Sequence, residues 1–113
     1  MIFGMPSVNI YTSKERVSSL EKILPGLREA VARELSCADR TLANDEISVR
    51  VLVPDAALQI ADTELEIKAH SYGDRVKRQD DICKGVKSYV QKECLRAGSV
   101  YVWLQLTELG HSA

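Results

Sequence analysis

The chain repeats one order of hydrophobic patterns: a strand-like run, a helix-like stripe and a second strand-like run. Apolar and polar residues alternate in four stretches, which cover residues 6–11, 46–53, 64–71 and 99–107. This alternation has the period of a β-strand with one buried face. Apolar residues three and four positions apart fill the intervals 25–37 and 75–96, which is the period of an amphipathic helix. The repetition predicts two consecutive β-α-β units.

Proline and glycine set the predicted helix boundaries. Pro25 interrupts a helical pattern that begins near residue 14, and proline fits only the first turn of a helix. We therefore expect the first long helix to begin near Pro25, and we interpret residues 14–24 as a lead-in with one or two helical turns. Gly98 lies just beyond the second predicted helix, where glycine commonly follows a helix end.

The two units are predicted to form a single α+β domain of 113 residues with one four-stranded sheet. Residues 6–55 form the first half, residues 62–108 form the second, and residues 1–5 are an N-terminal extension. A helix between two strands favours parallel pairing within each half, and one apolar face per strand favours both helices on the same side of the sheet. The ferredoxin-like fold has the same order of elements and is the alternative, in which the protein would be a ligand-binding module.

The other face of the predicted sheet is partly polar and partly aromatic, which suits a subunit interface or a ligand-binding wall better than a solvated surface. Its residues are Asn9, Tyr11, Ser48, Arg50, Glu66, Lys68, His70, Tyr101, Trp103 and Gln105.

Charge and cysteine content exclude several classes of function. Fifteen Lys and Arg residues oppose sixteen Asp and Glu residues, so the net charge of −1 provides no basic field for nucleic acid. No apolar run approaches the length of a membrane span, and no secretory leader is evident, so we expect a cytoplasmic protein that binds neither nucleic acid nor membrane. Cys37, Cys83 and Cys94 are widely spaced, which predicts neither a disulfide framework nor a metal site.

Four motifs along the chain, taken together with the duplication, resemble the tautomerase superfamily, and within it most closely the 5-carboxymethyl-2-hydroxymuconate isomerases. The motifs are Met5-Pro6 before the first strand, Leu24-Pro25-Gly26-Leu27 at the first helix, Val49-Arg50-Val51 in the second strand followed by Asp55, and Arg75 with Lys77-Arg78-Gln79 at the second helix. They cover nearly the whole chain in order. The resemblance implies a homotrimer that acts on a small-molecule carboxylate without a cofactor or metal.

The resemblance also implies site residues. Pro6 matches the family's amino-terminal proline, whose secondary amine moves a proton between carbon and oxygen in an enol or dienol acid. Arg50 and Arg78 match best the arginines that hold the substrate carboxylate and stabilise the enolate, with Arg75 as the alternate. An α-amino group titrates near neutrality, so this proline needs no partner base.

Inside a chain, however, the nitrogen of Pro6 is a tertiary amide without basicity. Two expectations follow from the five residues before it. In the first, translation starts at Met5 and removal of that methionine frees the proline. In the second, the protein is a catalytically silent trimer with the same fold.

The arginines also have structural interpretations. Arg50 could form a cross-strand salt bridge with Glu64 or Glu66. Arg75 and Arg78 lie at the start of a predicted helix, where positive charge opposes the helix macrodipole, so helix stability does not account for them and an anion would. A solvated charged turn is the alternative for this pair.

Overall fold

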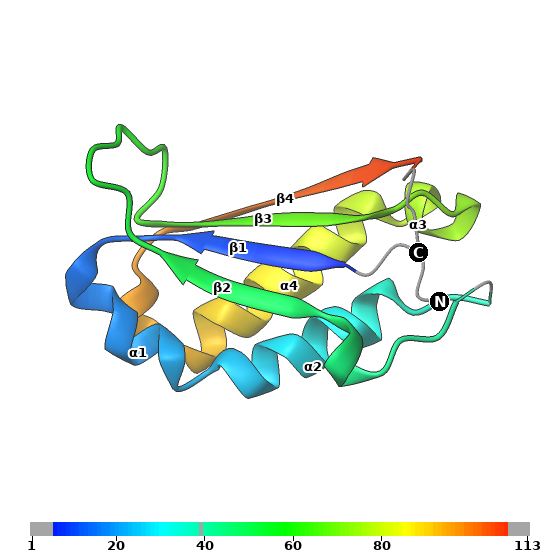
Figure 1. The fold of residues 1–113 in the computed structure, drawn as a ribbon, viewed down its shortest axis with the longest axis horizontal. Helices are drawn as coiled ribbons and strands as arrows, with labels where there is room; N and C mark the ends of the chain where they lie inside the picture. Colours follow the sequence, from blue (N-terminus) through cyan, green and yellow to red (C-terminus); the bar gives the residue numbers. More distant parts are fainter. Residues whose placement is uncertain (1–5, 39, 109–113) are drawn as a thin grey trace.

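The computed structural model describes residues 6–38 and 40–108, and the predicted extension, residues 1–5, lies outside them. Within the described residues, one sheet has the order β2-β1-β3-β4 (Figure 1). Its strands are β1 (Ser7–Tyr11), β2 (Ser48–Leu52), β3 (Thr63–His70) and β4 (Val100–Thr107). The helices are α1 (Val17–Glu21), α2 (Leu24–Leu35), α3 (Gly73–Lys77) and α4 (Gln79–Glu93), with 3-10 turns at Lys14–Arg16, Asn44–Glu46 and Leu95–Ala97.

The strand pairing confirms the two β-α-β units. β1 pairs in parallel with β2, β3 pairs in parallel with β4, and the halves join through the antiparallel pair β1–β3. In a ferredoxin-like sheet the two strands of each unit are separated by a strand of the other unit. Here they are neighbours, so the ferredoxin-like alternative is wrong.

The helices cover one face of the sheet, as predicted (Figure 1). Val8 and Ile10 of β1 are fully buried beneath them, whereas the alternating residues of β1 are only partly buried. The predicted stripes of the long helices contribute the buried residues Leu27, Ala30, Val31 and Leu35 from α2 and Ile82, Val86 and Val90 from α4. Each fully buried aliphatic side chain contributes roughly 1.5–3 kcal/mol, so this layer accounts for much of the stability of the fold.

The prediction of one continuous helix over residues 75–96 is wrong. The helical stretch breaks at Arg78, whose backbone angles are φ −105° and ψ 15°, and α4 ends at Glu93. The break aligns the side chain of Arg78 with the end of α2, where it donates hydrogen bonds to the carbonyl oxygens of Glu34 and Ser36. Contacts between residues so far apart in the sequence do not change the local spacing of apolar residues, so that spacing could not predict the break. The lead-in at residues 14–24 is confirmed as one 3-10 turn and the short helix α1.

None of the helices in residues 6–38 and 40–108 is both long enough and apolar enough to span a membrane.

Candidate functional site

Pro6 lies at the end of the sheet where the second half of the chain finishes its strands. It is buried, and its carbonyl oxygen accepts a hydrogen bond of 3.2 Å from the backbone N–H of Ser48. The next residue, Ser7, pairs with Lys68 of β3, so Pro6 lies beside the last residues of that strand. The α3 helix follows β3 at this same end (Figure 1).

Arg75 of α3 is fully buried at this end of the sheet. Its Nε donates to the carbonyl oxygen of Leu35 at 2.8 Å, and its Nη1 donates to the carbonyl oxygen of His70 at 3.0 Å. The guanidinium carbon lies 4.9 Å from the centre of the Tyr72 ring. Within the described part of the chain, Nη2 has no hydrogen-bond partner. Burial is the main cause that lowers the pKa of Arg75 below its ordinary value, and the nearby Cys37 opposes this.

The side chain of Arg78 is 33% exposed, and all three of its guanidinium nitrogens donate hydrogen bonds. Nε donates to Asp74 at 2.8 Å, Nη1 to the carbonyl of Glu34 at 3.1 Å and Nη2 to the carbonyl of Ser36 at 3.3 Å. The hydrogen bond with Asp74 is the main cause that raises the pKa of Arg78.

The two arginines therefore stand at the C-terminal end of α2, on the carbonyls of its last residues. Positive charge is favourable there, because the last carbonyls of a helix lack partners within the helix. The sequence pattern predicted that helix stability would not account for Arg75 and Arg78. That prediction is wrong, because both side chains stabilise α2 and not the helical stretch that carries them. These contacts account for the guanidinium nitrogens of both arginines except Nη2 of Arg75.

Arg50 lies on the opposite face of the sheet, so one protomer does not bring it together with Arg75 and Arg78. Its Nη1 donates to Oδ1 of Asn9 at 3.5 Å, and Nδ2 of Asn9 donates to Oε1 of Glu66 at 3.1 Å. The expected salt bridge is therefore replaced by a chain of hydrogen bonds through Asn9, across three strands. The Glu66 carboxylate also lies 3.9 Å from the Lys68 ammonium.

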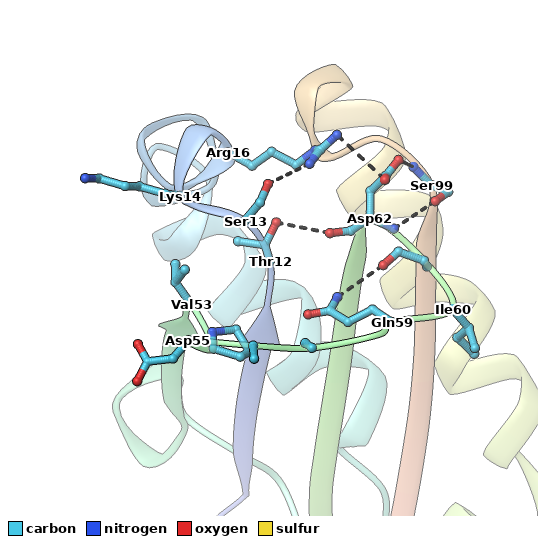
Figure 2. A pocket seen from close by; sticks show the side chains of 14 residues that line it. Thr12, Ser13, Lys14, Arg16, Val53, Asp55, Gln59, Ile60, Asp62 and Ser99 are labelled. Carbon is cyan, nitrogen blue, oxygen red and sulfur yellow. Dashed lines mark hydrogen bonds and ion pairs between the residues drawn. The ribbon is translucent and has the colours of Figure 1, made fainter.

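A pocket of about 440 Å³ lies at the other end of β1 from Pro6, and the motifs did not predict it. It opens between the start of the first 3-10 turn and the loop that joins β2 to β3 (Figure 2). The residues that line it are Thr12, Ser13, Lys14, Arg16, Val53, Pro54, Asp55, Ala56, Ala57, Gln59, Ile60, Ala61, Asp62 and Ser99. Polar residues follow β1 directly and precede β3 and β4. They could have indicated this pocket, because these strand ends meet at one edge of the sheet.

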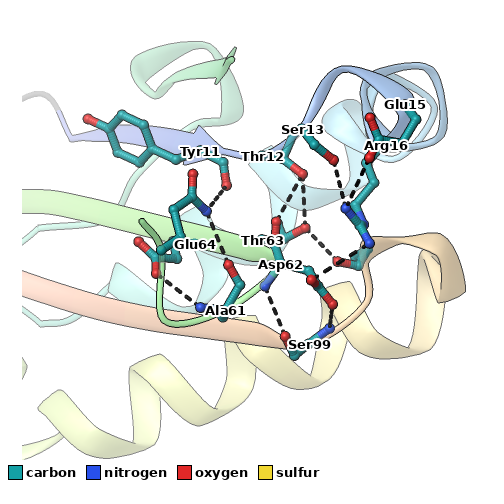
Figure 3. Close-up of polar contacts among 12 residues, drawn as sticks. Tyr11, Thr12, Ser13, Glu15, Arg16, Ala61, Asp62, Thr63, Glu64 and Ser99 are labelled. Carbon is teal, nitrogen blue, oxygen red and sulfur yellow. Dashed lines mark hydrogen bonds and ion pairs between the residues drawn. The ribbon is translucent and has the colours of Figure 1, made fainter. Parts of the chain in front are cut away.

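Asp62 is the centre of the polar contacts beside this pocket (Figure 3). Its Oδ2 accepts a hydrogen bond of 3.0 Å from the backbone N–H of Ser99, and its own N–H donates to Oγ of Ser99 at 2.9 Å. Arg16 lies 3.7 Å from Asp62 and donates to Oγ of Ser13 at 2.6 Å. The N–H of Ser99 is the main cause that lowers the pKa of Asp62, and Arg16 adds to it. These charges are already paired, so the pocket wall is a structural network.

Comparison with protein-family models finds no match, and comparison with curated proteins finds none either. Solved structures do match. A macrophage migration inhibitory factor-like protein from Entamoeba histolytica is 10% identical with a TM-score of 0.66, and the match covers 96% of each chain. Malonate semialdehyde decarboxylase is 10% identical with a TM-score of 0.64, covering 89% of this chain and 84% of that one. A 5-carboxymethyl-2-hydroxymuconate delta-isomerase is 14% identical with a TM-score of 0.61, covering 96% and 85%.

These three structures belong to the tautomerase superfamily. The chain therefore has the tautomerase fold, as the sequence motifs indicated.

Proposed function

We propose that a chain beginning at Pro6 is an isomerase of the tautomerase type, which moves a proton within a small enol or dienol carboxylic acid. The observation that carries the proposal is the unpartnered Nη2 of Arg75, buried at the end of the sheet where Pro6 lies. A buried guanidinium without a carboxylate partner among the described residues is costly, and a substrate carboxylate would offset that cost. The tautomerase fold supports the same conclusion.

Arg75 is well placed to hold the carboxylate because its orientation is already fixed. Two nitrogens are held by the carbonyls of Leu35 and His70, and Nη2 is the donor left for a ligand oxygen, which would reach it once the side chains that bury it move aside. His70 ends β3, and Pro6 lies beside the end of that strand. A preorganised donor of this kind stabilises developing negative charge without reorganisation during the reaction.

In the proposed reaction the amine of Pro6 accepts a proton from one position of the substrate and returns it to another. The electron pair left behind forms an enolate, whose charge the arginine stabilises. No atoms are lost or gained, so the step needs no cofactor. An amide-linked Pro6 lacks the required lone pair, so release of Pro6 from Met5 is a condition for activity.

The other two arginines have weaker roles in the proposal. The three guanidinium nitrogens of Arg78 already donate to Asp74 and to carbonyl oxygens at the end of α2, so Arg78 contributes mainly its positive charge to substrate binding. Arg50 lies on the far face of its own sheet and would reach a substrate only as a contribution from a neighbouring copy.

We also propose that the protein is a homotrimer. Several large apolar side chains on the far face of the sheet and its adjoining loop are exposed, including Leu58, which is fully exposed, Ile60 at 77% and Tyr101 at 44%. Burial of such side chains favours association. The cytoplasmic location stays a prediction.

The test compares two forms of the protein, one that begins at Pro6 and one that retains residues 1–5. Phenylenolpyruvate and 2-hydroxymuconate are suitable substrates, because each is a small enol acid. We expect turnover from the trimmed form alone. Equal rates from both forms would eliminate Pro6 as the base, and no turnover from either would favour the catalytically silent trimer.

A further inference from the structure

The loop between β2 and β3, residues 53–62, presents two large apolar side chains to solvent. Leu58 is fully exposed, and Ile60, two positions further along, is 77% exposed. Figure 1 shows this loop standing out from the sheet on the side opposite the helices. Large apolar side chains exposed together on one segment are typical of an interaction site.

Hydrogen bonds fix the second half of this loop. Oε2 of Glu64 accepts from the backbone N–H groups of Ile60, at 2.7 Å, and Ala61, at 3.2 Å. Nε2 of Gln59 donates to the carbonyl oxygens of Tyr11, at 3.3 Å, and Ala61, at 3.1 Å. Because the loop is already ordered, its docking on a partner costs little conformational entropy.

A groove of about 470 Å³ lies between α2 and the edge of the sheet formed by β2, whose strand neighbour in the described residues is β1. The groove is lined by Leu24, Pro25, Arg28, Ile47, Ser48, Val49 and Arg50. Leu24 and Val49 pack against the core but stay partly exposed. The lining contains two arginines and no acidic residue, so the groove combines apolar surface with positive charge.

The guanidinium of Arg28 has a fixed position in this groove. Its Nε donates to the carbonyl oxygen of Ile47 at 2.9 Å. Within residues 6–38 and 40–108, Arg28 forms no ion pair with a carboxylate. Since the carbonyl of Ile47 is already occupied, this end of the edge suits incoming side chains better than a further strand.

We infer that the β2–β3 loop of one copy docks into this groove of a neighbouring copy. Leu58 and Ile60 contact the apolar part of the groove, and the carboxylate of Asp55 pairs with the partner's Arg28. Asp55 is exposed, has no ion pair in the described part of the chain, and points away from the contacts around Asp62 (Figure 2). The inference rests on the homotrimer proposed above, and it names the segment and the surface that join its copies.

The loop and the groove are different surfaces of the same copy, so the contact is heterologous. A heterologous contact repeated by rotation produces a closed ring of copies. In a ring of three, each copy supplies one loop and receives one. Every loop and every groove is then filled, as the proposed homotrimer requires.

The groove between α4 and β4 is a poorer receptor for the loop. It has a volume of about 400 Å³, and its lining includes Asp80 together with Lys84 and Lys87. Asp80 would repel the carboxylate of Asp55. Both lysines are exposed, and fixing an exposed lysine costs side-chain entropy, whereas Arg28 is already oriented.

Aspartate substitutions test the loop. Sedimentation equilibrium of the whole chain is expected to give three copies. Leu58→Asp and Ile60→Asp should each raise the dissociation constant at least about tenfold, because each brings a charge into an apolar contact. Leu95→Asp is the matched control, since Leu95 is 88% exposed but lies outside the loop and the groove, and it should leave the constant unchanged.

A charge exchange tests the groove. Asp55→Arg places arginine against arginine, and Arg28→Glu places glutamate against aspartate, so each should raise the dissociation constant at least about tenfold. The double variant D55R/R28E re-forms an ion pair and should associate more tightly than either single variant. Arg33→Glu, at an exposed position of α2 outside the groove, is the matched control and should change nothing.

The masses are measured independently of turnover, so this inference and the proposed chemistry can fail separately. A trimer that none of the loop and groove variants weakens would overturn the inference and leave the homotrimer standing. A trimer that L58D weakens but R28E does not would overturn the assignment of the groove. A wild-type mass of one or two copies would overturn the inference together with the homotrimer, while turnover from the form that begins at Pro6 still tests the isomerase.

Discussion

The Nε atom of Arg75 lies 2.8 Å from the carbonyl oxygen of Leu35, the last residue of α2. This contact joins the second half of the chain to the C-terminal end of α2. It places a positive charge where the helix dipole is negative, and it satisfies a carbonyl that has no partner within the helix. The same side chain keeps one nitrogen unpartnered within the described part of the chain, and this nitrogen is the donor to which the proposed function assigns the substrate carboxylate.

Replacing Arg75 with methionine should destabilise the protein by roughly 2–4 kcal/mol, because two buried carbonyl oxygens lose a charged donor. The loss is partly offset, since methionine needs no desolvation of a charge. Urea unfolding followed by circular dichroism measures the difference. The matched variant Arg78→Met, at a partly exposed position, should cost only about 1 kcal/mol. Equal losses from both variants would contradict the special role of Arg75.

Gly98 should not tolerate a side chain. Its backbone angles are φ 73° and ψ −144°, a region that is essentially restricted to glycine, and an added Cβ would collide with the carboxylate of Asp62. We expect Gly98→Ala to cost at least about 2 kcal/mol. Gly73→Ala is the control, because nothing lies within 4 Å of its added Cβ, and thermal unfolding should place it within about 0.5 kcal/mol of the wild type.

The sequence predicted the fold because hydrophobic periodicity records which face of each element is buried. Val8 and Ile10 alternate with polar residues, and the stripe of α2 repeats at three and four positions, so four strands and two long helices could be predicted. The break at Arg78 could not. Its cause is a set of hydrogen bonds to Glu34 and Ser36, more than forty positions away, and the apolar spacing continues across the break.

The candidate site could be predicted only as a set of residue types. The motifs indicate Pro6, Arg50 and Arg78, with Arg75 as the alternate, but which face of the sheet each occupies depends on strand order. The sequence could not show that Arg75 is buried or that Arg50 contacts Asn9. The pocket beyond β1 was missed because the loop from Val53 to Asp62 has no periodic signal.

Stability should depend on the ionisation of Asp62. Its pKa in the folded protein lies below the ordinary value of 3.8, so the folded state favours the carboxylate. The contribution is therefore fully present above the unfolded pKa and disappears as the pH falls through the lowered, folded value. Asp62→Asn should be less stable than the wild type near neutral pH, and the difference should shrink below about pH 3.8. Urea midpoints measured across this range test it, and a difference that stays constant with pH would exclude the carboxylate as its source.

The role of Arg50 can be separated from its contact with Asn9. In a chain that begins at Pro6, Arg50→Ala removes a charge proposed to bind the substrate of a neighbouring copy, and it also breaks the 3.5 Å contact with Asn9. Loss of one such charged contact costs about 2–4 kcal/mol of transition-state stabilisation, so turnover should fall roughly 30-fold to 1000-fold. Asn9→Ala breaks the same contact but keeps the guanidinium, so its rate should stay within a few-fold of the wild type. Steady-state kinetics with phenylenolpyruvate distinguish the two. If both variants lose activity to the same extent, Arg50 acts by holding the sheet together, and the proposed substrate contact is wrong.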